Sequence, residues 1–392
     1  MDGHLQNSQR EPSHQTDAAA HSCSADSATR DSTTRDGQTR EAVAGQKATH
    51  LETYSIKKNT EYVQRENRAT RETVTSSTTF SATVQAVAAK ALETFQQEID
   101  SQQLYYHGLE HVEGVDRRAK LIFDTVVPWY EQAPNDGTDW DRQRELLHLS
   151  AIAHDMLQIF RPQTSPHTPR QRRSGDSEKA TIKKLLIFLQ EIKSPPKVDA
   201  EEKEHSSAEE AHFSSTDIQI LEEAIKATIC QYDSDDGSIY QPWLYAEHRE
   251  GKPISLVARC LALADIGTLG IDGIEAYRKE GALLLLEENT DIIPFLKNRS
   301  EFDSTFRENV RERLLKRARF EVAFARGRLN RLDQELSGLP TGAIDQLKEQ
   351  VFKHLTPQTI ETIAAETPTS DSTSLAQLLN YFQLERCAQQ AP

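Results

Sequence analysis

The sequence has 392 residues, 61 of them acidic and 46 basic, which gives a formal net charge of −15. This length can form a sizeable core with an enclosed pocket, whereas the negative charge argues against broad binding to nucleic acid or to anionic membranes. Four widely separated cysteines without a CxxC pair argue against a disulfide framework and against a thiolate zinc site.

The segment 1–79 is rich in Ser, Thr, Gln, Asp and Arg and has two aromatic residues, Tyr54 and Tyr62. Such a segment buries too little apolar surface to offset the entropy of ordering, so we predict a disordered polar tail. Its 10 basic and 11 acidic side chains nearly cancel, so the acidity belongs to the remainder of the chain. Because no export signal or membrane span is visible, we expect a cytoplasmic protein.

Apolar residues from Phe80 to Ile99 recur at spacings of three and four, which predicts a first helix. A second helix is predicted over "GLEHVEGVDRRAKLIFDTVV", ending near Pro128, and a third over "DWDRQRELLHLSAIAHDMLQIF". Further helices are expected at about 176–192, 216–231, 255–269, 273–289 and 301–336. No segment shows sustained period-two alternation, so we predict an all-α fold.

The predicted organisation has one main helical domain, at 80–336, after the polar tail. The stretch 193–215 is acidic and polar, and we expect an exposed insertion there rather than a domain boundary. From 337 to 392, beginning with "SGLP", three short amphipathic pieces predict a small C-terminal helical appendage. Homo-oligomers are compatible with this sequence.

Two predicted apolar helices contain charged residues that would be costly to bury alone. The pair His154 and Asp155 lies in "AIAHDML", and Asp265 lies in "ARCLALADIGTLG". A divalent metal would compensate their charge, and a mixed imidazole and carboxylate set suits Mn, Mg, Fe, Ni or Zn. The alternative is that these are ordinary buried polar residues with hydrogen-bond partners in the protein.

The order His111, His154-Asp155, Asp265 resembles the H…HD…D pattern of the HD superfamily of metal-dependent phosphohydrolases. The opening "YHGLEHVEGV" is similar to the YHNxxHxxxV motif of several HD families, including the cyclic-nucleotide phosphodiesterases. The resemblance covers about residues 80–290 and implies an HD-type helical bundle. Gly108 stands where Asn is usual, no GYP motif follows the HD pair, and "HDMLQI" lacks the acidic pair of the guanosine-tetraphosphate hydrolases. The missing GYP motif makes the subclass that carries it less favoured, and the missing acidic pair does the same for the guanosine-tetraphosphate hydrolases.

The resemblance implies a role for each residue of the pattern. His111, His154, Asp155 and Asp265 would be the metal ligands, and His107 would protonate the leaving oxygen. Asp155 or a nearby carboxylate would orient the attacking water, and Glu178 resembles the acidic residue that some HD families place beside the metal. The alternative for His107 and His111 is an ordinary pair of surface histidines at a helix start.

Several basic residues follow the HD pair. We predict that the side chains of four of them could clamp substrate phosphates: Arg161, Arg172, Arg173 and Lys179. The alternative is a solvated loop. In "QYDSDDGSIYQPWL", Tyr232, Asp233 or Trp243 could touch a base or a sugar, with structural packing as the alternative.

A second metal ion would need further ligands between the HD pair and Asp265. The histidines of that region lie in predicted loops or polar insertions, so we predict one divalent ion. The predicted function is hydrolysis of a small phosphate ester, of a nucleotide or a related compound, by metal-activated water. The alternatives are a regulatory nucleotide-binding HD module with little turnover, and a protein-interaction role for the tail and the C-terminal helices.

Overall fold

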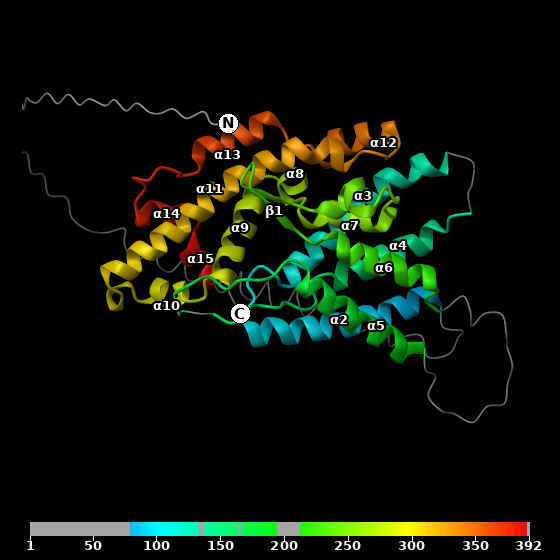
Figure 1. Cartoon of the computed structure of the whole chain (residues 1–392), viewed down its shortest axis with the longest axis horizontal. Helices are drawn as coiled ribbons and strands as arrows, with labels where there is room; N and C mark the ends of the chain where they lie inside the picture. Colours follow the sequence, from blue (N-terminus) through cyan, green and yellow to red (C-terminus); the bar gives the residue numbers. More distant parts are fainter. Residues whose placement is uncertain (1–78, 133–136, 164, 166, 194–211, 390–392) are drawn as a thin grey trace, which may run out of the picture. The chain divides into compact units, whose positions relative to one another are not determined.

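The computed structural model describes residues 79–132, 137–163, 165, 167–193 and 212–389, and these residues are mostly helical (Figure 1). The predicted all-α fold is therefore confirmed. Except for Thr79, the predicted polar tail lies outside the described residues, and so does most of the predicted insertion at 193–215.

Six helices contribute to the core around the candidate site: α2 (Phe80–Gln102), α3 (Leu109–Glu131), α4 (Trp140–Ala153), α5 (Asp176–Lys193), α6 (Ser215–Ala227) and α7 (Leu256–Asp265). Helix α3 packs against α4 and α7, and α4 also packs against α2 and α6. The C-terminal end of α4 is buried from Leu149 to Ala153, as expected of a central helix.

Helix α3 continues through Pro128, so the predicted end at this proline is wrong. Proline cannot donate the backbone hydrogen bond to the carbonyl four residues earlier, that of Asp124. Both residues are exposed, so water can satisfy that carbonyl. The buried Val126 and Val127 and the half-buried Trp129 hold this last part of the helix against the protein.

The third predicted helix is too long at its C-terminal end, because α4 stops at Ala153 instead of reaching Phe160. After the HD pair the chain is extended, and hydroxyl groups of α5 accept its backbone hydrogen bonds. Thr181 accepts from the Leu157 N–H at 3.2 Å, and Ser177 accepts from the Ile159 N–H at 3.0 Å. The HD pair therefore lies in the turn that follows α4.

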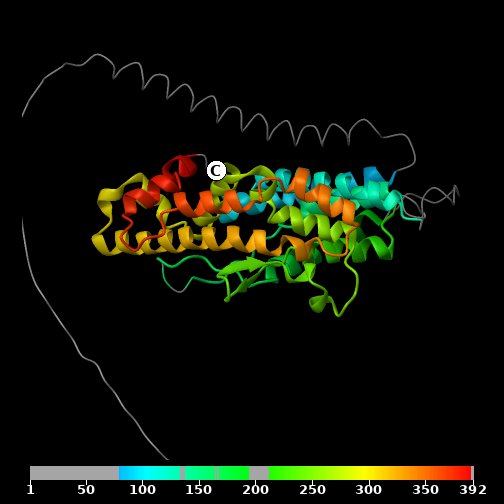
Figure 2. The ribbon, with the colours of Figure 1, turned by 90° about the horizontal axis from the view of Figure 1, so that it is seen from above.

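Two short strands, β1 (Gln231–Asp233) and β2 (Ser238–Tyr240), form an antiparallel hairpin that the sequence analysis did not predict. Strands of three residues are too short to show period-two alternation. Strand β2 packs against α11 (Ser304–Glu335) (Figure 2).

The remaining helices all follow β2 in the sequence. They are η1 (Pro242–Leu244), η2 (Ala246–Arg249), α8 (Thr268–Asp272), α9 (Ile274–Glu288), α10 (Ile292–Lys297), η3 (Arg299–Glu301), α12 (Thr341–Gln346), the π-helix η4 (Leu347–Val351), α13 (Pro357–Glu366), α14 (Leu375–Tyr381) and α15 (Leu384–Gln389). Side chains of α12, η4 and α13 join the core of α2–α7, whereas α14 and α15 pack in a second apolar cluster with α9, α10 and α11. Of the helices described, none has the length and apolar character needed to cross a membrane.

Glu321 of α11 provides a prediction about stability, because its side chain is only 1% exposed. Burial raises the pKa of Glu321 from 4.5 to about 7, and Arg317 and the Tyr381 hydroxyl offset this rise only in part. The folded protein then binds the proton more tightly than the unfolded chain. The free energy of unfolding should therefore fall as the pH rises from 4.5 to about 7.

We expect Glu321→Gln to remove this fall and to be more stable than the parent at pH 8 by about 1–3 kcal/mol. Urea unfolding at pH 5 and pH 8 measures the effect. Glu308→Gln, at an exposed position of the same helix, is the matched control and should retain the pH dependence of the parent. An unchanged pH dependence in Glu321→Gln would show that Glu321 titrates normally.

Candidate metal centre

Four side chains from three helices converge at one point. His111 lies in the first turn of α3, His154 and Asp155 follow the last residue of α4, and Asp265 is the last residue of α7. One ligand atom from each lies within 4.8 Å of all the others. The clustering predicted from the sequence is confirmed, with the difference that His154, Asp155 and Asp265 lie at helix ends instead of inside helices.

The distances within the cluster fit a shared ion. Oδ2 of Asp155 lies 3.0 Å from Nε2 of His154 and 3.3 Å from Nε2 of His111, and Oδ1 of Asp265 lies 3.6 Å from each of these nitrogens. Ligand atoms about 2.1 Å from one ion, at angles of 90–120°, lie about 3.0–3.6 Å apart. The Nε2 atoms of His111 and His154 are buried and have no hydrogen-bond partner among the described residues, so their lone pairs are available to an ion.

Neighbouring groups orient three of the four ligands. Nδ1 of His154 lies 2.8 Å from the Ala151 carbonyl, which leaves Nε2 for the cluster. Gln158 donates to Oδ1 of Asp155 at 3.1 Å and leaves Oδ2 free. In the same way Gln241 donates to Oδ2 of Asp265 at 3.1 Å and leaves Oδ1. Each carboxylate therefore presents one oxygen to the cluster and holds the other in a hydrogen bond.

Burial disfavours charge on every member of the cluster, but the opposite charges of its other members outweigh burial. His154, followed by His107 and His111, keeps the pKa of Asp155 well below its usual range, and the pKa of Asp265 is also lowered. Asp155 and Asp265 in turn raise the pKa of His154 well above its usual value. Two half-buried carboxylates thus lie where positive charge is favoured, and a divalent cation can supply that charge.

His107 lies next to this cluster, outside helix α3, since Gly108 is the N-cap residue. The ring centroids of His107 and His111 are nevertheless only 5.9 Å apart. Nε2 of His107 lies 3.7 Å from Oδ2 of Asp155 and 2.9 Å from Nη1 of Arg172. His107 can reach a group bound at the cluster without being one of the four ligands.

Glu287 of α9 holds His107 in place, and the sequence analysis missed this residue. Nδ1 of His107 lies 2.5 Å from Oε1 of Glu287, and Oε2 accepts the backbone N–H groups of Tyr105, Tyr106 and His107 at 3.0 to 3.1 Å. Burial raises the pKa of Glu287, but His107 and Arg172 outweigh it and hold the pKa at about 2. An acid at the end of the apolar run "LLLLEEN" was the available signal.

Of the four basic residues predicted to bind substrate, the structure places Arg172 at the cluster. Its Nη1 donates to Oε1 of Gln158 at 2.6 Å and approaches His107. Arg161, Arg173 and Lys179 are exposed. Glu178 is half-buried, and burial followed by the charges of Asp155 and Asp265 raises its pKa, so its carboxyl group lies near the cluster.

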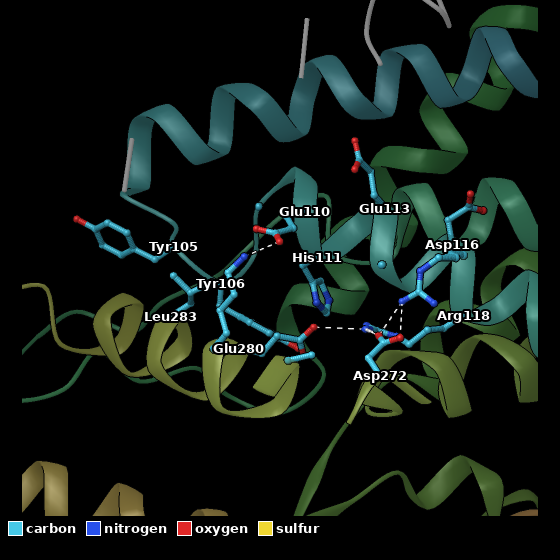
Figure 3. Close-up of a pocket in the computed structure, with 15 residues that line it drawn as sticks. Tyr105, Tyr106, Glu110, His111, Glu113, Asp116, Arg118, Asp272, Glu280 and Leu283 are labelled. Carbon is cyan, nitrogen blue, oxygen red and sulfur yellow. Dashed lines mark hydrogen bonds and ion pairs between the residues drawn. The ribbon is translucent and has the colours of Figure 1, made fainter. Parts of the chain in front are cut away.

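A cavity of about 710 Å³ adjoins His111 and is lined by residues of α3, α8 and α9 and of the segment before α3 (Figure 3). The Tyr106 ring packs against His111, with centroids 4.4 Å apart. The buried Arg118 donates to the carbonyl of Ala264 at 2.9 Å, directly before the ligand Asp265. The cavity therefore touches the residues that position two of the ligands.

Comparisons of this chain with protein-family models, with curated proteins and with solved structures gave no match. A functional assignment therefore depends on the geometry of the site.

Proposed function

We propose that this chain is a metal-dependent phosphohydrolase that cleaves a phosphate ester, of a nucleotide or a related compound, with water. The proposal rests on one observation, the cluster of four candidate ligands. Among the described residues, the Nε2 atoms of its two histidines have no hydrogen-bond partner, and each of its two carboxylates has one oxygen facing the cluster. His107 and Arg172 lie beside it. The similarity to the H…HD…D pattern supports it. When a phosphate ester is bound, these side chains would lie next to the reacting phosphorus and its oxygens.

The residues that would hold the ion are His111, His154, Asp155 and Asp265. A divalent ion supplies charge neutralisation at a phosphoryl oxygen and lowers the pKa of bound water. The donor set does not select one ion among Mn, Mg, Fe, Ni and Zn. We propose that each chain binds one divalent ion at these four residues.

The side chains around the ion would handle the protons. Glu287 fixes the Nδ1 side of His107, so Nε2, which accepts from Arg172 in the free site, is the atom that would carry a proton to the leaving oxygen once substrate phosphate engages Arg172. The raised pKa of Glu178 suits it to accept a proton from the attacking water. Arg172 presents a guanidinium next to His107 that could pair with phosphoryl oxygens.

A screen for phosphate release tests the proposed function. The purified full chain is stripped of metal with a chelator and assayed with each of the five ions on nucleoside mono-, di-, tri- and cyclic phosphates. We expect hydrolysis that depends on the added ion and disappears with chelator. Binding of nucleotides without turnover under any ion would contradict the proposal and favour a regulatory nucleotide-binding module.

A further inference from the structure

A second cavity, of about 480 Å³, is lined by Tyr130 of α3 and by residues of the segments 244–259 and 334–339. None of the four candidate metal ligands lines this cavity, so it is separate from the metal centre. Its charged lining residues are three basic and one acidic: Arg249, Lys252, Arg259 and Glu247. In a chain with a net charge of −15, this cavity therefore has a local excess of positive charge.

Two of the basic residues are buried arginines without an acidic partner. Arg249 and Arg259 are each 9% exposed, and neither forms an ion pair with a carboxylate of the described residues. The two other buried arginines of the described chain, Arg118 and Arg328, do pair with carboxylates. Burying a cation without an opposite charge costs free energy. The surroundings of Arg249 and Arg259 therefore favour an added anion.

Backbone carbonyls hold the two arginines and leave part of each guanidinium group unused. Arg249 donates from Nε to the carbonyl of Lys252 at 2.9 Å. Arg259 donates from Nη1 to the carbonyls of Glu335 at 3.0 Å and Ser337 at 2.5 Å. Within the described part of the chain, neither Nη2 atom has a hydrogen-bond partner or is fully buried. Each Nη2 is thus left for a ligand.

The Nη2 atom of Arg259 lies at the wall of the cavity. Gly338, a lining residue, has no side chain over it, since a Cβ atom there would lie 3.8 Å from this nitrogen. Burial lowers the pKa of Arg259, Tyr130 offsets this in part, and the positive charge of Arg249 lowers it further. The two guanidinium groups therefore repel each other, and an anion bound to both would relieve the repulsion.

We propose that this cavity binds a small organic phosphate, with Arg249 and Arg259 on the phosphate oxygens, at a site separate from the metal centre. A phosphate monoester carries a charge of about −1.5 to −2, which matches the excess of basic residues better than a single carboxylate does. Guanidinium groups also suit the geometry of phosphate oxygens.

The rest of the lining suits the organic part of such a ligand. A cavity of 480 Å³ lies within the usual range for small-molecule sites. Beside the arginines it is lined by two aromatic and several apolar residues, among them Tyr130, Tyr245, Leu244, Leu256 and Leu339. Because no candidate metal ligand lines the cavity, binding there should not require a metal ion.

Titration calorimetry with phenyl phosphate and with inorganic phosphate tests this site. The full chain is stripped of metal and dialysed free of chelator, so that no ion can hold phosphate at the metal centre. We expect one phenyl phosphate to bind per chain, about 10-fold more tightly than inorganic phosphate, because its ring is removed from water. Equal affinities would overturn the organic part of the proposal, and no binding of either would overturn the site.

Variants locate the bound phosphate. Arg259→Gln should weaken binding about 10- to 100-fold, because hydrogen bonds to a charged group are lost. Lys252→Glu reverses an exposed charge and should weaken binding about 3- to 10-fold. Arg326→Gln, which removes an exposed arginine of α11, is the matched control and should bind like the parent.

Arg172→Gln separates this site from the metal centre and should also bind phenyl phosphate like the parent. If Arg172→Gln lost affinity while Arg259→Gln and Lys252→Glu kept it, the phosphate would lie at the metal centre and the proposal would be overturned. Unchanged affinity in all these variants would overturn it as well. Circular dichroism checks the fold of each variant, and if Arg259→Gln does not fold, Lys252→Glu decides.

Discussion

Replacing His154 or Asp265 by alanine should abolish metal-dependent hydrolysis, with a loss of about 10²–10³-fold or more, because each supplies one of four ligand atoms. Metal binding, measured by titration calorimetry, should weaken in parallel. The metal-free Asp265 variant should lose some thermal stability, because His111 and His154 stabilise the charged carboxylate more than Asp155 repels it.

Two control variants match these substitutions. His148→Ala removes a histidine of α4 that pairs with Asp116 instead of joining the cluster, and Asp124→Ala removes an exposed aspartate of α3. Both should keep the metal affinity and the activity of the parent. If His154→Ala and Asp265→Ala hydrolysed phosphate esters as fast as these controls, the ligand assignment would be wrong.

His107→Ala should bind metal normally and lose rate by about 10²–10⁴-fold, the usual contribution of a general acid. The loss should be large for an alkyl or ribosyl phosphate and much smaller for a nitrophenyl phosphate, whose leaving group needs no proton. Glu287→Gln should change the rates in the same direction, because it weakens the contact that fixes Nδ1 of His107.

Steady-state rates on the two kinds of ester, with calorimetry for the metal, test the role of His107. His248→Ala, at an exposed position, is the control and should resemble the parent. Equal losses on both esters would argue against proton donation by His107. Loss of metal binding would instead make His107 a ligand.

The helices could be predicted from the sequence because they depend on local patterns, and the ligand set because the order of its residues resembles the H…HD…D pattern. The spacing of apolar residues from Phe80 to Ile99 marks α2, and a carboxylate such as Asp265 in an apolar stretch is costly unless something compensates it. The helix ends were less predictable. The chain after Asp155 leaves the helix because hydroxyl groups of α5, distant in sequence, accept its backbone hydrogen bonds.

The residues that orient the site could not be predicted in the same way. Gln158 and Gln241 are neutral side chains without a distinctive spacing, and their roles arise only where the folded chain brings them to Asp155 and Asp265. Glu287 is 180 residues from His107 in the sequence, so no local pattern connects the two.

Anomalous X-ray diffraction from crystals of the full chain grown with Mn²⁺ tests the proposed metal centre most directly. We expect a peak at the manganese edge about 2.0–2.5 Å from the Nε2 atoms of His111 and His154 and from one oxygen each of Asp155 and Asp265. A manganese peak elsewhere in the protein, with these four side chains holding no ion, would contradict the assignment.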